Sequence, residues 1–124
     1  MTLKRKYEQL PTYCQFEKNL NIIKNKWTIY IIRDLILGKK FFSEFKENQP
    51  NLSNKILSQR LKELENNNII IKKVEDYETS YYLTEKGRKL QNILYELAIF
   101  NIEEEYSGEE LEDIKKELEK LKYK

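Results

Sequence analysis

The stretch LSNKILSQRLKELENNN, residues 52–68, decides the fold, and it is followed directly by the β-favouring run III at 69–71. Leu57, Leu61 and Leu64 recur at positions i, i+4 and i+7, so they form one apolar stripe along a helix. The opposite face carries short or flexible polar side chains, at Asn54, Lys55, Ser58, Gln59 and Lys62. Such groups suit base edges and phosphates in a DNA major groove, so the stretch predicts a DNA-reading helix.

Both ends of this helix have their own sequence signals. Ser53 is the predicted N-cap, whose hydroxyl accepts from backbone N–H groups two or three residues further on. The helix is expected to end at Asn66-Asn67-Asn68. Asn68 is the predicted left-handed residue, because asparagine tolerates a positive φ better than most residues do.

Apolar periodicity predicts three helices upstream of this stretch. Residues 14–24 are expected to form the first helix, preceded by a polar, basic arm over residues 1–13. Residues 26–37 have apolar side chains nearly all round, which predicts a central, buried helix that stops at Gly38. A short helix over residues 42–47 is then expected before the turn.

Downstream, alternating residues predict a hairpin with strands at 69–75 and 80–83 and a tip at 76–79. Thr84 is the predicted cap of one long helix that runs to about residue 105.

A last helix is predicted after Ser107 and Glu110, which form a capping-box pattern. Its apolar residues are Leu111, Ile114, Leu118 and Leu121. Since an isolated helix this short and this charged is marginal, we expect it to dock on another surface, most simply a second subunit.

Composition excludes several function classes. The chain has 124 residues, which suits one domain, and it contains no histidine and a single cysteine. An internal disulfide and a cysteine-based zinc cage are therefore excluded, and the commonest general base and metal ligand is missing. There is no phosphate-cradling glycine-rich loop. We predict a protein that is not an enzyme and needs no metal or organic cofactor.

The charge is unevenly distributed. Residues 1–90 hold 18 Lys/Arg and 11 Asp/Glu, a net charge of +7, whereas residues 91–124 hold 5 and 10, a net charge of −5. A basic body suits contact with a polyanion, and an acidic tail suits a segment kept away from it. The apolar runs are too short for a membrane span and no signal core precedes them, so we expect a cytoplasmic protein that does not contact a membrane.

The order helix, helix, helix, hairpin, long helix is that of a winged helix-turn-helix, and four motifs carry a closer resemblance. These are Cys14 with Lys26-Trp27, Gly38 with Phe42-x-Glu44-Phe45, the run from Leu52 to Glu65, and the run from Tyr81 to Arg88. Over residues 14–100 the chain resembles the HxlR-type transcriptional regulators, relatives of the MarR-like repressors. The resemblance implies a mainly α fold with a small β-hairpin. It does not cover the acidic helical extension at 101–124.

The chain departs from the family pattern in three places. Gln15 stands where the family usually has proline, and Phe41 stands where it usually has arginine. The wing is shorter than usual and its tip, residues 75–78, is acidic. Because a carboxylate repels phosphate, this wing is a poor candidate for insertion into a minor groove.

The predicted DNA contacts follow from the helix and its resemblance to the family's recognition helix. They are Ser53, Asn54, Lys55, Ser58, Gln59, Arg60 and Lys62. Gln59 is the main candidate for a base edge, since glutamine can pair bidentately with adenine. Lys55, Arg60 and Lys62 are expected on phosphates, although Arg60 could instead pair locally with Glu63 or Glu65.

Four lysines outside the helix are further candidates for the DNA backbone. Lys39 and Lys40 precede the third helix, where the alternative is a loop kept soluble by charge. Lys72 and Lys73 lie on the first wing strand, and alternation should turn only one of them toward DNA.

Cys14 has two interpretations. The resemblance implies a cysteine that senses oxidants or electrophiles, and a thiol near a helix N-terminus is more reactive. With no second cysteine, sensing would need an intersubunit disulfide or a small-thiol adduct. The alternative is a small, buried apolar residue that packs the first helix.

The hypothesis from sequence is a sequence-specific regulator of double-stranded DNA, a repressor that acts as a homodimer on an inverted repeat. Its effector would be an unknown small molecule or oxidant. The predicted interface comprises Phe16, Leu20, Ile93, Leu97, Phe100, Leu111, Ile114 and Leu118. The alternative hypotheses are a winged-helix protein-interaction module with weak or no specific DNA binding, and a nonspecific architectural DNA binder.

Overall fold

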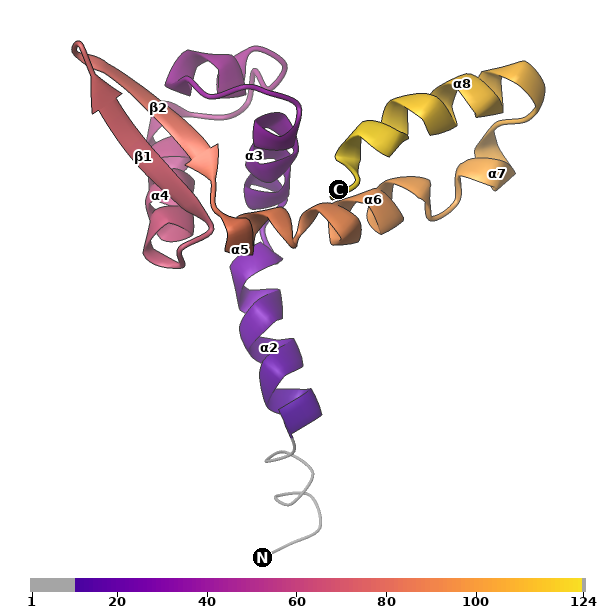
Figure 1. Cartoon of the computed structure of the whole chain (residues 1–124), viewed down its shortest axis with the longest axis horizontal. Coiled ribbons are helices and arrows are strands. Elements are labelled where there is room, and N and C mark those ends of the chain that lie inside the picture. Colours follow the sequence, from indigo (N-terminus) through magenta and orange to yellow (C-terminus); the bar gives the residue numbers. More distant parts are fainter. Residues whose placement is uncertain (1–10, 124) are drawn as a thin grey trace, which may run out of the picture.

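The computed structural model describes residues 11–123, with side chains described from residue 13 (Figure 1). Most of the predicted N-terminal arm, residues 1–10, lies outside the described residues. The end of that arm was predicted wrongly, because helix α2 begins at Pro11 rather than at Cys14. Proline is well suited to a first helical turn, where its missing N–H is not needed.

The elements over residues 26–83 form a compact unit, called the head below, and α2 extends away from it (Figure 1). In chain order, the elements from the N-terminus to the hairpin are α2 (Pro11–Ile23), α3 (Lys26–Ile36), η1 (Phe42–Lys46), α4 (Asn54–Asn66), β1 (Ile70–Glu75) and β2 (Glu78–Leu83). Asn25 caps α3 by accepting from the Trp27 N–H at 2.9 Å. Beyond α3, Gly38 has a φ of +99°, which fits its predicted role as the stop.

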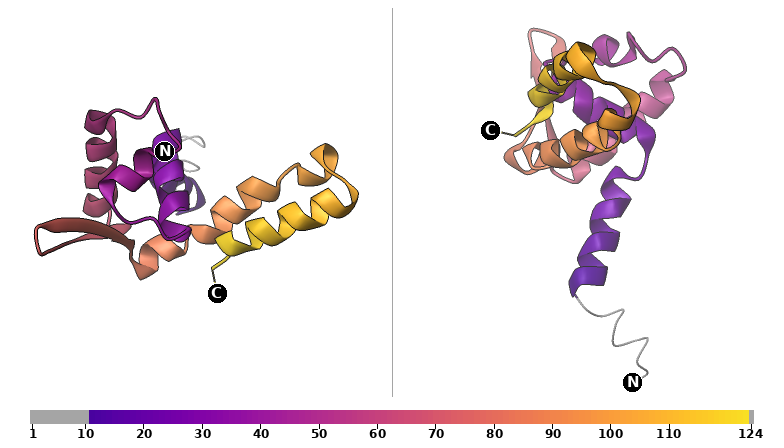
Figure 2. Two further views of the ribbon diagram at one scale, coloured as in Figure 1. Left: turned by 90° about the horizontal axis from the view of Figure 1, so that it is seen from above. Right: turned by 90° about the vertical axis from the view of Figure 1, so that its right-hand side faces the viewer.

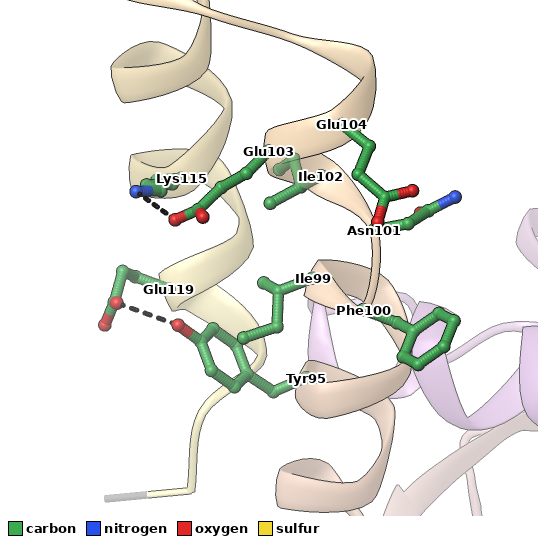
Figure 3. A pocket seen from close by; sticks show the side chains of 9 residues that line it. All are labelled: Tyr95, Ile99, Phe100, Asn101, Ile102, Glu103, Glu104, Lys115 and Glu119. Carbon is green, nitrogen blue, oxygen red and sulfur yellow. Dashed lines mark hydrogen bonds and ion pairs between the residues drawn. The ribbon is translucent and has the colours of Figure 1, made fainter.

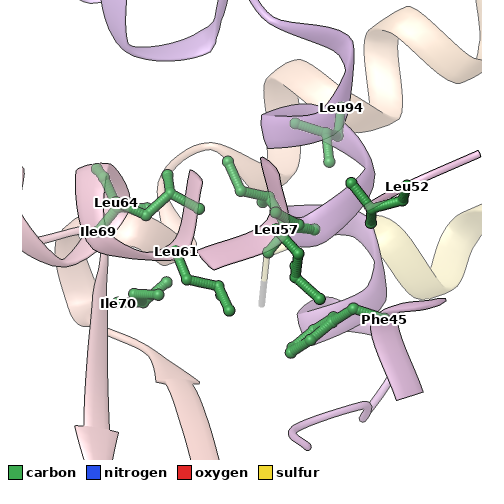
Figure 4. Close-up of a cluster of buried hydrophobic side chains, with 10 residues drawn as sticks. Phe45, Leu52, Leu57, Leu61, Leu64, Ile69, Ile70 and Leu94 are labelled. Carbon is green, nitrogen blue, oxygen red and sulfur yellow. The ribbon is translucent and has the colours of Figure 1, made fainter. Parts of the chain in front are cut away.

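The core of the head lies between α3, α4 and the start of the hairpin (Figure 4). Ile32 and Leu57 are fully buried, and Phe45, the side chain that η1 contributes, is 1% exposed. Ile69 and Ile70 lead from α4 into β1 and are buried with them. The base of the hairpin therefore packs against α4, and this contact fixes the position of the wing relative to that helix.

The hairpin turn is tighter than the sequence indicated. Residues 75 and 78 are paired in an antiparallel register, so only Asp76 and Tyr77 form the tip. Both have positive φ, 50° and 66°. A two-residue turn of this hand matches the right-handed twist of the strands, which favours it over the predicted four-residue tip.

The predicted long helix after Thr84 is broken into three. The segments are α5 (Glu85–Arg88), α6 (Gln91–Ile99) and α7 (Ile102–Glu105). Thr84 does cap the first, since its Oγ1 accepts from the Gly87 N–H at 2.9 Å. The second break falls at Asn101, with a φ of −127°, and the bend there lets Ile102 become 5% exposed.

The C-terminal helix α8 (Gly108–Leu118) ends in a 3₁₀ turn, η2 (Glu119–Leu121). Ser107 occupies the N-cap position but makes no side-chain cap hydrogen bond, so the predicted capping box is wrong. Ser107 has the extended backbone of an N-cap, but Gly108, the first residue of the helix, has a φ of +62° instead of a right-handed helical value.

Helix α8 folds back along α6 of the same chain, and the pair projects from the head (Figure 2). The buried Gln91 side chain donates to the Leu121 carbonyl at 3.2 Å. Tyr95 donates to Glu119 at 3.3 Å, and Lys115 pairs with Glu103 at 3.3 Å across a cavity of about 410 Å³ (Figure 3). The last helix therefore docks in the first instance on its own chain, and Leu111, Ile114 and Leu118 are half-buried there.

Candidate nucleic-acid interface

Helix α4 is fixed to the head by the apolar stripe that the sequence predicted. Leu57, Leu61 and Leu64 are 0%, 2% and 1% exposed (Figure 4). The opposite side chains are all exposed: Asn54, Lys55, Ser58, Gln59 and Lys62. The predicted division of this helix into a buried and an exposed face is confirmed. A rigid helix that presents a polar ridge can enter a major groove.

The start of α4 is held by two hydrogen bonds. The Ser53 hydroxyl accepts from the Ile56 N–H at 3.1 Å, so this side chain acts as the cap. Asn54 accepts from the Lys46 ammonium on η1. Lys46 thus brings a positive charge to the N-terminus of α4 that the sequence analysis missed. Its only sequence signal is a lysine eight residues before Asn54, and the fold of η1 decides where it points.

Arg60 does not belong to the exposed ridge. Its guanidinium donates to both carboxylate oxygens of Glu63, at 2.9 and 2.8 Å, which is the local alternative that the sequence left open. The side chain lines a cavity between α2, α3 and α4, beside Asn21 and Thr28. A phosphate contact by Arg60 would therefore require this ion pair to break.

The hairpin separates Lys72 from Lys73. Lys72 pairs with Tyr81 in the register and Lys73 with Ser80, so the two side chains point to opposite faces. Lys73 lies 4.9 Å from the centre of the Tyr82 ring.

Lys72 shares a groove with the exposed ridge of α4. This groove has a volume of about 360 Å³ and is lined by Ser58, Leu61, Lys62, Glu65, Asn66, Lys72 and Tyr81. Burial and the nearby Glu65 raise the pKa of Tyr81, so its phenol stays protonated at neutral pH. The ammonium groups of Lys62 and Lys72 and the phenol of Tyr81 in one groove are suited to a phosphate, whereas the carboxylate of Glu65, which also lines the groove, repels one.

The tip of the wing is acidic. Glu75, Asp76 and Glu78 surround Tyr77, whose side chain is fully exposed. Since these carboxylates repel phosphate, the positively charged part of the wing is its stem near Lys72 rather than its tip.

Lys39 and Lys40 lie on the opposite side of β2 from β1. The Lys40 carbonyl accepts from the Tyr81 N–H at 2.8 Å, and Phe41 forms a β-bridge with Ser80. Hydrogen bonds from the Lys40 and Phe41 backbone, with the charges of both lysines, lower the pKa of Glu44. These two lysines are half-buried and do not line the groove beside α4.

Two exposed apolar surfaces lie away from the α4 ridge. On α2, Phe16 and Leu20 are 68% and 47% exposed. On α6 and at its end, Ile93, Leu97 and Phe100 are 48%, 62% and 86% exposed. Cys14 is also exposed, on the same helix as Phe16.

Within residues 11–123, no group of three or more His, Cys, Asp or Glu side chains is placed to hold a metal ion. In the same part of the chain, no helix has the length and apolar character needed to cross a membrane.

The order of helices and hairpin, with α4 buried on one face and polar on the other, defines a winged helix-turn-helix protein. The chain belongs to the HxlR-like helix-turn-helix family, which matches residues 22–109. It is thus a helix-turn-helix transcriptional regulator.

Two relatives from Bacillus subtilis are each 38% identical to this chain over the aligned residues. The uncharacterized HTH-type regulator YvaP aligns over 68% of this chain and 81% of its own length, and the HTH-type regulator YodB over 69% and 80%. Both relatives are described as HTH-type transcriptional regulators.

Solved structures show the same fold. The reduced form of YodB from B. subtilis is 34% identical with a TM-score of 0.63, and covers 75% of this chain and 91% of its own. The redox regulator HypR in its oxidized form is 31% identical with a TM-score of 0.67, and covers 77% and 99%. YodB has also been solved in a quinone-bound form.

Proposed function

We propose that this chain is a sequence-specific repressor that binds double-stranded DNA as a homodimer on an inverted-repeat operator. The observation that carries the proposal is the exposed ridge of α4 beside the groove that contains Lys62 and Lys72. Repression would follow from occupation of a promoter.

Each side chain of the ridge has a proposed role. Gln59 contacts a base edge, while Lys55 and Lys62 contact phosphates. Ser58 and Asn54 stand on the same face and add short polar contacts. Ser53 contributes as the cap, and Arg60 supports the helix through Glu63.

The exposed apolar side chains support a dimer. Phe16 and Leu20 on α2, with Leu97 and Phe100 at α6, present large apolar surfaces to solvent in a single chain. Exposed surfaces of this kind are typical of protein interfaces. We propose that a second copy covers them, together with Ile93 and the flank of α8 at Leu111, Ile114 and Leu118. The two α4 ridges would then stand about 34–36 Å apart, one helical turn of B-DNA.

Cys14 is proposed as a second functional residue, a sensor of oxidants or electrophiles. Two observations favour it: the thiol is exposed on α2 beside the proposed interface, and related regulators have been solved in oxidized and quinone-bound forms. A disulfide between the two subunits would change how α2 packs.

The DNA contacts can be tested with a matched pair of lysine variants. An operator is first selected from random duplexes, and affinity is then measured by fluorescence anisotropy over a range of salt. Lys72→Gln is expected to lower the salt slope by about 1, because one phosphate contact is lost, whereas Lys73→Gln leaves it unchanged. Gln59→Ala should lose about 1–3 kcal/mol of discrimination at one base position.

Two results would count against the proposal. Equal losses in the Lys72 and Lys73 variants would mean that net charge, not the groove, binds DNA. Failure to select any sequence would favour the protein-interaction module or the nonspecific binder, and the acidic wing tip is the feature that favours a protein partner.

A further inference from the structure

A second cavity, of about 270 Å³, lies where the end of α3, the base of the wing and the start of α6 meet. It is distinct from the groove beside α4. Its lining residues are Leu35, Ile36, Gly38, Lys39, Lys40, Tyr81, Tyr82, Leu83, Arg88 and Gln91. We propose that this cavity binds a small organic anion, a carboxylate or phosphate group attached to an apolar body about the size of one aromatic ring.

The charge of the lining points to an anion. Lys39, Lys40 and Arg88 come from two separate segments of the chain and all line this cavity, and none of its lining residues is acidic. The Lys40 ammonium itself lies 5.1 Å from the centre of the Phe41 ring. Lysine and arginine donate the charge-assisted hydrogen bonds that bind carboxylate and phosphate groups.

The carboxylates beside these cations have other partners, and Glu85, on the same short helix as Arg88, accepts from the Tyr123 hydroxyl at 2.7 Å. Asp34 is buried and accepts from the Arg33 guanidinium at 3.1 Å. Its other oxygen forms an ion pair with the Lys39 ammonium at 3.9 Å, which balances part of the Lys39 charge but is too long for a hydrogen bond, so the N–H donors of Lys39 can still bind a ligand. Glu44 accepts instead from the backbone N–H groups of Lys40 and Phe41.

The rest of the lining selects an apolar body. Leu35, Ile36 and Leu83 supply the apolar part of the lining, and Tyr82 adds an aromatic ring. An apolar wall with a few convergent polar groups is the usual composition of a small-molecule site. The volume is close to the lower end of the range for such sites, about 300 Å³, so the ligand must be small.

The test is a titration of the full chain with benzoate, without DNA, followed by ¹⁵N–¹H NMR. The chain has three glycines, which makes their amide signals easy to assign. Gly38 lines the cavity, whereas Gly108 opens α8 and does not. We expect the Gly38 signal to shift with saturation and the Gly108 signal to stay in place.

Variants identify the cations. Arg88→Gln and Lys40→Gln should each weaken benzoate binding roughly tenfold or more, the usual loss for a charge-assisted hydrogen bond. Lys89→Gln, which changes the same charge next to Arg88 but outside the cavity, should bind benzoate as the unaltered chain does. The backbone hydrogen bonds of Lys40 do not involve its side chain, so folding is spared.

Three results would overturn the proposal: a Gly38 shift that is absent or rises without saturation, equal weakening in the Lys89 and Arg88 variants, or inorganic phosphate binding at least as tightly as benzoate. Phosphate leaves the apolar wall uncovered, so it is expected to bind more weakly. Since no DNA is present, the outcome is independent of the proposed repressor function.

Discussion

Gly87 offers a sharp test of how the head is joined to the C-terminal helices. It lies in α5, and a Cβ added there would stand 2.2 Å from the Ile69 carbonyl oxygen and 3.1 Å from the Leu83 side chain. The Ile69 carbonyl cannot move easily, because it accepts from the Thr84 N–H at 3.0 Å, and the neighbouring Asn68 carbonyl accepts from the Thr84 hydroxyl at 2.6 Å. The Gly87→Ala substitution must therefore push α5 away from the base of the wing.

The sign of the effect separates two arguments. Helix propensity alone predicts that alanine stabilises a helix by up to about 1 kcal/mol relative to glycine. The short distance between the added Cβ and the Ile69 carbonyl oxygen predicts instead that alanine destabilises the protein. Overpacking costs about 1–3 kcal/mol and a weakened hydrogen bond about 1 kcal/mol more. After subtracting the propensity gain, we expect a net loss of about 2 kcal/mol, or roughly 10 °C in Tm for a chain of this length.

The assay is thermal unfolding followed by circular dichroism at fixed protein concentration, because association would shift Tm. Gly108→Ala is the matched control. Its φ of +62° makes alanine unfavourable by about 1 kcal/mol, but no atom lies within 4 Å of the added Cβ. A Gly87→Ala protein that melts at or above the original temperature, or that loses less than Gly108→Ala, would refute the reasoning.

Two further predictions concern the dimer and Cys14. In analytical ultracentrifugation the chain should sediment as a dimer, and Leu97→Asp should shift it toward monomer. Val74→Asp, a change at an equally exposed site on the wing, should leave the dimer intact. If the unaltered protein sediments as a monomer, the proposed pairing of two α4 ridges has no basis. Treatment with diamide should lower operator affinity and produce a covalent dimer on a non-reducing gel, and Cys14→Ser should abolish both effects. An unchanged affinity in the treated protein would contradict a sensing role for Cys14.

Local sequence signals were sufficient for much of the α4 region. The spacing of Leu57, Leu61 and Leu64 defined the buried face, and the Ser53 cap and left-handed Asn68 set the ends. These features depend on residues close together in the chain, where periodicity and capping rules apply directly. The stop at Gly38 and the cap at Thr84 were predictable for the same reason.

The errors occurred where contacts distant in sequence override local preference. The apolar pattern after Thr84 predicted one long helix, but the chain bends at Asn101, Ile102 is buried, and α8 folds back along α6. Ser107 and Glu110 have the residues of a capping box, yet Gly108 directs the chain differently. The last helix docks on α6, which no local pattern in α8 could indicate.

The sequence by itself determined the family, the recognition-type helix and the residues of its polar face, because these follow from periodicity and from motifs within short windows. Only the tertiary structure decided which wing lysine stands beside that helix, since the register of two paired strands turns Lys72 and Lys73 to opposite sides. It also decided that Arg60 pairs with Glu63, and that Lys39, Lys40 and Arg88 line one cavity. The physical reason is the same in each case: the direction of a side chain depends on how its element packs against others.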